Sequence, residues 1–195
     1  MSTKLGEIIE SNSTEFTAES YELHDVPALG SLVKITSPQL DIFGIVCQSG
    51  TSGIEPGRRP IARGKDETSE QAVYQSSPQL MKLLRSEFRV LVMGHKIDDK
   101  IIQYLPPTPA HIHAFVHPCT TEEIQQFSRS FGFLSILINN RLPISTEELV
   151  AATLREMSKV QPDPHAFLVA AGKALTITLS GEYHRLKTIL ARIRQ

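Results

Sequence analysis

The spacing of apolar residues changes once along this chain, near residue 119, and no other feature constrains the fold as strongly. Before this point, apolar and polar residues alternate in short segments, as they do in half-buried β-strands. After it, apolar residues recur every three or four positions, as they do in amphipathic helices. Strands followed by helices indicate an α+β fold. We therefore predict a small antiparallel β-barrel at residues 1–118 and a helical domain at residues 119–195.

The segments before residue 119 carry the pattern of short strands. Around residues 14–22, for example, Phe16 and Ala18 share one face and their polar neighbours share the other. Gly44 lies inside an apolar segment, where a glycine typically marks a bulge or a sharp bend at a barrel corner. The predicted strands are residues 5–10, 14–22, 32–35, 42–47, 88–93, 101–105 and 111–116.

Residues 49–77 interrupt this pattern with four glycines, two prolines and many charged residues. Such a long segment without an apolar face is uncommon inside a compact domain, and it is usually functional or disordered. We predict a long mobile loop that projects from the barrel. A short helical turn or an irregular strand is expected next, at residues 79–84.

Helix start signals follow residue 119. Thr120 precedes Glu123 by three positions, and Ser145 precedes Glu148 by the same spacing, so both pairs predict capping boxes. Residues 133–138 are apolar and fit either a strand or a buried helix. The predicted helices are residues 120–130, a helix from residue 145 to the prolines at 162 and 164, residues 165–180 and residues 182–193, the last two joined at Gly181.

Composition excludes several classes of protein. The net charge of −1 argues against a strong overall attraction to nucleic acid. No apolar run is long enough for a transmembrane helix, and the first residues lack the apolar region of a signal peptide. Two cysteines, Cys47 and Cys119, are too few for a disulfide framework, so we expect free thiols in a cytosolic protein.

Charge is unevenly distributed along the chain. Residues 1–48 contain two basic and seven acidic residues, whereas residues 78–195 contain fourteen basic and ten acidic residues. This asymmetry fits either attraction between subunits or an ordinary solvated surface.

Sequence signatures of catalysis are missing. Gly64-Lys65 is followed by Asp66 instead of the Ser or Thr of a phosphate loop, and Gly172-Lys173-Ala174 fails in the same way. The nearest approach to a nucleophile elbow, residues 50–54, lacks the final glycine. His24 and Asp25 are adjacent, so on a strand they would point to opposite faces. We therefore predict a protein that is not an enzyme and that needs no cofactor.

The best metal candidate is a group of histidines. On a strand, His111 and His113 would point to the same side about 7 Å apart, which suits two zinc ligands. His117 and Cys119 are further candidate ligands. The alternative, which we favour, is that these histidines lie on the surface of an edge strand and bind no metal.

Three groups of residues are candidates for contact with a partner. Arg58, Arg59 and Arg63 lie in the long loop, where flanking acidic residues neutralise them. An apolar stripe with Leu186, Ile189 and Ile193 marks the last predicted helix, and it fits either core packing or an interface. The aromatic residues Phe43 and Phe88 are expected at the contacts between subunits if the chain self-associates.

A resemblance to a known family is carried by Gly6, Ile8, Phe16, Leu29–Ile35, Asp41–Val46, Phe88–Gly94 and Leu105–Pro109. Their arrangement resembles the HAS-barrel, the small β-barrel that precedes the motor of DNA-translocating ATPases and of rotary ATP synthase subunits. In that family the barrel carries no catalysis and packs against neighbouring barrels in a ring. Where those relatives continue into an ATPase, this chain has helical residues 119–195.

These observations favour a non-catalytic module for assembly or interaction, with a protein partner or self-association in a closed symmetry. The first alternative is an accessory nucleic-acid-binding component of a DNA translocase or repair complex. The second is a metal-dependent enzyme built on His111 and His113.

Overall fold

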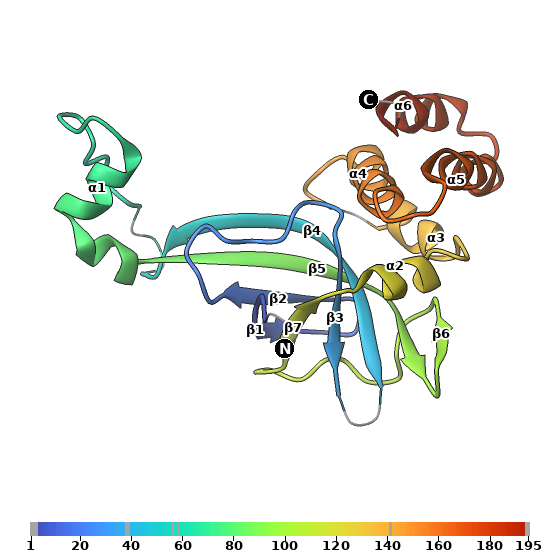
Figure 1. Ribbon diagram of the computed structural model, residues 1–195, viewed down its shortest axis with the longest axis horizontal. Helices are drawn as coiled ribbons and strands as arrows, with labels where there is room; N and C mark the ends of the chain where they lie inside the picture. The colour runs from blue at the N-terminus through green and yellow to red at the C-terminus, as the bar shows by residue number, and fades with distance from the viewer. Residues whose placement is uncertain (1–3, 38–39, 56, 58, 141, 194–195) are drawn as a thin grey trace.

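The strands of the first half form one antiparallel sheet in the computed structural model (Figure 1). The structure describes residues 4–37, 40–55, 57, 59–140 and 142–193. Its strands are β1 (Gly6–Ser11), β2 (Glu15–Ser20), β3 (Leu32–Thr36), β4 (Asp41–Gly53), β5 (Leu84–Ile97), β6 (Lys100–Ile102) and β7 (Phe115–Pro118). The strand pattern of the sequence therefore predicted the order of these elements.

Six of these strands close into a barrel. Around the barrel the order is β1, β2, β5, β4, β3 and β7, and β7 pairs with β1 to complete the circle. β6 lies outside this circle and pairs only with the end of β5, through a turn at Asp98 and Asp99. Because every pairing is antiparallel, the predicted antiparallel barrel is confirmed.

Alternating side chains fill the barrel. Phe16 and Ala18 of β2 point inward, as their spacing predicted, and they meet Phe88 and Val90 of β5. These residues belong to an interior cluster in which Ile8, Ala18 and Val90 are fully buried. Burial of this apolar surface on closure is the main favourable contribution to the stability of the barrel.

Gly44 lies at a bulge of β4, as the sequence indicated. The register between β4 and β5 shifts between Phe43 and Gly44, and a second shift lies between Val46 and Gln48. A Cβ atom on Gly44 would lie 2.4 Å from Cγ1 of Val90 and 2.8 Å from the carbonyl oxygen of Leu91. Only glycine therefore lets β4 approach β5 this closely.

The helices follow the barrel, with caps where the sequence placed them. They are α2 (Thr121–Phe127), α3 (Phe133–Ile138), α4 (Thr146–Ser158), α5 (Pro164–Thr178) and α6 (Tyr183–Ile193), and α1 (Glu70–Ser76) and the 3₁₀ turn η1 (Pro78–Lys82) precede β5. Thr120 and Glu123 form the predicted capping box. At α4 the hydroxyl of Ser145 accepts from the amide of Glu148. Residues 133–138 form a buried helix, which settles their ambiguity.

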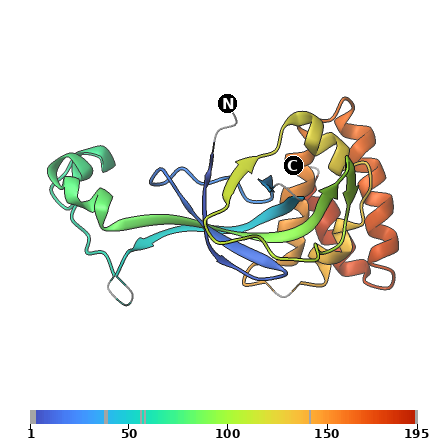
Figure 2. The ribbon, with the colours of Figure 1, turned by 90° about the horizontal axis from the view of Figure 1, so that it is seen from below.

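The helices pack on one outer side of the barrel (Figure 2). Phe43, Ile45, Leu91 and Met93 point outward from β4 and β5 into this second core, which the helices complete. Gln103 joins the two parts: its amide donates to the carbonyl oxygens of Phe127 (2.7 Å) and Ser130 (3.2 Å), and its own oxygen accepts from the amide of Phe133. Both faces of these strands are therefore buried near the helices.

Three expectations about elements were wrong. Residues 49–53, expected in the loop, continue β4, and residues 70–76 form α1 within the same segment. Residues 111–113 form a turn instead of a strand, and β7 begins only at Phe115. The third difference concerns β6, which ends at Ile102 instead of reaching Leu105.

Candidate docking site on the projecting arm

β4 and β5 continue beyond the barrel as a two-stranded arm (Figure 1). The arm begins after the bulge at Val46, and its cross-strand pairs run from Gln48 with Arg89 to Gly53 with Leu84. Residues 48–52 are exposed. A bulge bends a strand and increases its twist, so the irregularity at residues 46–48 turns the arm away from the barrel.

Two short helical segments form the tip of the arm. The amide of Ile54 donates to the carbonyl oxygen of Leu83 (3.0 Å) and continues the ladder beyond β4. Ser69 caps the start of α1, where its hydroxyl accepts from the amide of Ala72, and η1 carries Pro78 in its first turn. Neither segment contains a buried residue, so the tip is a small unit on a long support.

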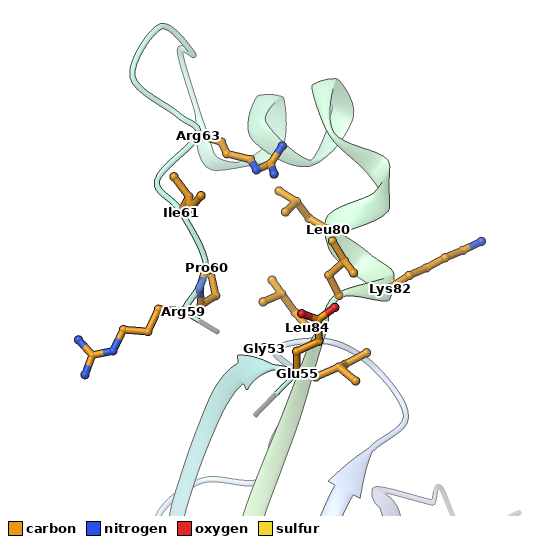
Figure 3. Close-up of a pocket in the computed structure, with 11 residues that line it drawn as sticks. Gly53, Glu55, Arg59, Pro60, Ile61, Arg63, Leu80, Lys82 and Leu84 are labelled. Atoms are coloured by element: carbon orange, nitrogen blue, oxygen red, sulfur yellow. The ribbon is translucent and has the colours of Figure 1, made fainter. Parts of the chain in front are cut away.

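A cavity of about 150 Å³ lies within this tip (Figure 3). One wall is the extended segment from Arg59 to Arg63, and the opposite wall is η1 with the start of β5. Its lining is mainly apolar: Ile54, Pro60, Ile61, Leu80, Leu83 and Leu84. Ile61 is 75% exposed and Leu83 46% exposed, so much of this apolar surface remains in contact with water.

Basic side chains surround the cavity. Arg59 and Lys82 point away from it on its two sides, while Arg63 extends toward the helices (Figure 3). Glu55 is the one acidic residue of the lining among the described residues. A ligand of the tip would therefore meet an apolar floor with a cationic rim, which suits a surface that carries apolar and acidic groups together.

A network of hydroxyl groups ties the arm to the barrel at His24. Ring atom Nε2 of His24 lies 2.8 Å from the Tyr74 hydroxyl, and Nδ1 lies 3.3 Å from the Thr51 hydroxyl. The His24 amide donates to the buried hydroxyl of Ser86, which in turn lies 2.7 Å from that of Thr51. His24 has a φ of 68°, an uncommon value for a residue with a side chain.

This network links the arm to the segment that follows β2. His24 uses both ring nitrogens within it, one on Tyr74 and one on Thr51, and Ser86, which accepts from the His24 amide, is 1% exposed. The adjacent residues His24 and Asp25 could be noticed in the sequence. Tyr74 could not be recognised as a neighbour of His24, because its one signal is that it is a lone aromatic residue in a polar segment.

Phe43 and Phe88 do not lie at a surface, which corrects their prediction as contact residues. Each is 1% exposed. Phe43 packs against Phe127 under the helices, with ring centroids 5.6 Å apart, and Phe88 lies inside the barrel. An aromatic residue on a strand gives no indication of which face is covered, so their burial could not be read from the sequence.

The remaining contact candidates have mixed outcomes. Ile189 and Ile193 are buried in the core between the helices and the barrel, and Leu186 packs against it, so the core interpretation of that stripe is confirmed. Arg59 and Arg63 line the tip cavity. Arg58 lies outside the described residues.

The candidate metal ligands are not brought together. His111 and His113 belong to a turn, and Nδ1 of His113 bonds the Glu7 carboxylate (2.5 Å), while His117 lies on β7 opposite Lys34. Across the part of the chain that the structure describes, no three His, Cys, Asp or Glu side chains are placed to hold a metal ion. The shared strand face on which the zinc hypothesis depended does not exist.

Both cysteines are free thiols, as expected. Burial raises the pKa of Cys47 to about 11, and burial also raises the pKa of Cys119. Both therefore stay protonated at neutral pH and are poor nucleophiles. No described helix combines the length and the apolar character needed to cross a lipid bilayer.

No family model and no curated protein matches this chain.

Proposed function

We propose that this chain is a non-catalytic assembly module that contacts other protein subunits through its arm. The observation that carries this proposal is the tip, where Ile54, Ile61 and Leu83 surround a cavity at a distance from both cores. Exposed apolar residues gathered around a hollow and rimmed by polar groups are typical of interaction sites. Burial of such a patch would contribute about 25 cal/mol for each Å² of apolar surface removed from water.

The division of the molecule supports the same proposal. Most apolar residues of the barrel and the helices pack into two cores, which explains their positions without a partner. The described residues of the arm form no comparable core, and α1 and η1 contain no buried residue. Ordering a segment of this kind costs conformational entropy. Docking on another protein would offset that cost by burying the exposed apolar groups.

The resemblance to the HAS-barrel leads in the same direction, because barrels of that family pack beside one another in a ring. The proposal for this chain is an assembly with closed symmetry, in which the barrel and helices hold the arm in position. The two free cysteines fit a cytosolic site for this assembly.

The test is a substitution at the tip that leaves both cores intact. Ile61→Asp places a charge at a position that is 75% exposed, so the fold should tolerate it. Ile177→Asp on α5 is the matched control, because Ile177 is 79% exposed and far from the arm in sequence. In sedimentation velocity, the wild type and the Ile177→Asp variant should associate alike, and Ile61→Asp should associate more weakly. Equal association of all three proteins would contradict the proposal.

One observation favours the alternative of a nucleic-acid-binding component. Arg59, Arg63 and Lys82 gather around the same cavity, and cations on a projecting arm can neutralise phosphates without reading bases. A labelled DNA duplex should then bind at low salt, lose affinity steeply as salt rises, and bind less tightly to the Arg59→Ala/Arg63→Ala variant. Absence of binding at low salt removes this alternative.

A further inference from the structure

One edge of β4 along the arm has no partner strand among the residues that the structure describes. β3 leaves β4 at the Leu32–Ile45 pair, and the last bonds on that side join Val46 to Gly30 and Ser31 (2.8 and 3.0 Å). From Gln48 to Gly53, β4 pairs with β5 on one side, and the described residues make no backbone hydrogen bond on the other. This edge therefore presents free backbone groups to water.

The alternation of an antiparallel ladder identifies which groups point outward. The amide of Ile54 bonds Leu83 of the neighbouring strand, so Ile54 turns its backbone toward that strand. Because consecutive residues turn to opposite sides, Ser52, Gly50 and Gln48 also bond toward β5. The outward residues are Ser49, Thr51 and Gly53.

This edge lacks the features that prevent strands from pairing. Natural edge strands are usually protected by lysines, prolines, inward charges or a covering segment. Residues 48–52 read Gln-Ser-Gly-Thr-Ser, without a charge or a proline, and all five are exposed. An uncharged edge can meet its own copy without bringing like charges together.

Resting on the proposed function, we infer that this edge of β4 pairs antiparallel with the same edge of a second copy of this chain. Two-fold symmetry about Thr51 would place Ser49 opposite Gly53 of the second copy and Thr51 opposite its own equivalent. Each such pair exchanges two bonds, so the joined arms gain about six backbone hydrogen bonds. The two arms then form one continuous four-stranded sheet.

Charge does not oppose this arrangement. Acidic and basic residues nearly balance at the tip, and antiparallel arms place the two tips at opposite ends of the seam. Exposed Glu22 and Asp25 flank His24, which contacts Thr51, so carboxylates lie beside the path of the second arm.

The test is Ser49→Pro, compared with Ser49→Ala. Proline removes the outward N–H at residue 49 and leaves the bonds of Gln48 and Gly50 to β5, and an edge strand accepts proline where its N–H faces outward. Alanine removes the same hydroxyl and keeps that N–H. By sedimentation equilibrium we expect a dimer, a dissociation constant about tenfold higher for Ser49→Pro, and an unchanged constant for Ser49→Ala.

A second variant guards against an effect of proline on the arm itself. Ser49→Lys keeps the backbone donor and places a charge at the seam, so it should weaken the dimer without a change in melting temperature. Equal dissociation constants for the Pro, Lys and Ala variants, or a wild type that stays monomeric at every concentration, would overturn the inference. Association that responds to Ile61→Asp but to neither Ser49→Pro nor Ser49→Lys would overturn edge pairing alone and leave docking by the tip standing.

Discussion

At the scale of single residues, Gly44 shows that the close packing of β4 against β5 requires a particular amino acid. A Cβ atom there would lie 2.4 Å from Cγ1 of Val90 and 2.8 Å from the carbonyl oxygen of Leu91, and this oxygen cannot move without disturbing the backbone of β5. Gly50 lies in the same strand, yet nothing lies within 4 Å of the position its Cβ would take. The two glycines therefore have different reasons to be present.

We predict that Gly44→Ala lowers the free energy of unfolding by about 1–3 kcal/mol, because the added methyl group forces the two strands apart. Gly50→Ala is the control and should leave it within about 0.5 kcal/mol. Urea denaturation followed by circular dichroism measures both. An unchanged midpoint for Gly44→Ala would contradict the close approach of β4 and β5 at this residue.

Single residues also show what could be predicted from the sequence. Gly44 and the Thr120 cap were identified because a glycine within a strand and a Thr-x-x-Glu pattern each report a local backbone requirement. Phe43 and Phe88 were misplaced because burial depends on which distant helix or strand covers a face. The histidine hypothesis failed because residue 113 adopts a φ of 68°, which ends the strand on which it depended.

At the scale of elements, the contact between the barrel and the helices depends on Gln103, which follows β6. Its side chain uses both donors and its acceptor on the segment from Phe127 to Phe133. Only an amide can satisfy two carbonyl oxygens and one N–H at the same time.

We predict that Gln103→Glu destabilises the fold by about 1–3 kcal/mol at pH 7, because a carboxylate of the same shape would face two carbonyl oxygens. The unfavourable contact holds the proton on the new carboxyl in the folded state, so its pKa rises above the unfolded value of about 4.3. The loss of stability relative to the wild type should therefore grow as the pH rises above about 4. Urea denaturation at pH 4 and pH 7 measures this; an equal loss at both values would contradict the assigned hydrogen bonds.

The arm is the element that sequence patterns could not reveal. A strand is recognised by one buried face, but residues 48–52 are exposed on both faces and therefore show no alternation. Their small polar residues are typical of loops, and only the pairing with residues 84–89 makes them a strand. Ser69, the cap of α1, is a local start signal for a helix, and the pattern of apolar residues does not include it.

At the scale of the whole molecule, the chain consists of a body, made of the barrel and the helices, and an extension. The closed barrel and the helices share strands β4 and β5, whose inner side chains fill one core and whose outer side chains fill the other. The same two strands then leave the body as the arm (Figures 1 and 2). A contact made at the arm is thus connected to both cores by continuous backbone.

The most direct measurement is the oligomeric state of a variant without the arm. Replacing residues 51–86 by Asn-Gly joins Gly50 to Glu87, a hydrogen-bonded pair that a two-residue turn can close, and it keeps Phe88 in the barrel. Circular dichroism and cooperative melting first establish that the variant folds. In sedimentation equilibrium we predict that the full chain forms a reversible dimer and that the armless variant is monomeric at the same concentrations. Self-association of the armless variant with the same dissociation constant as the full chain would contradict the account.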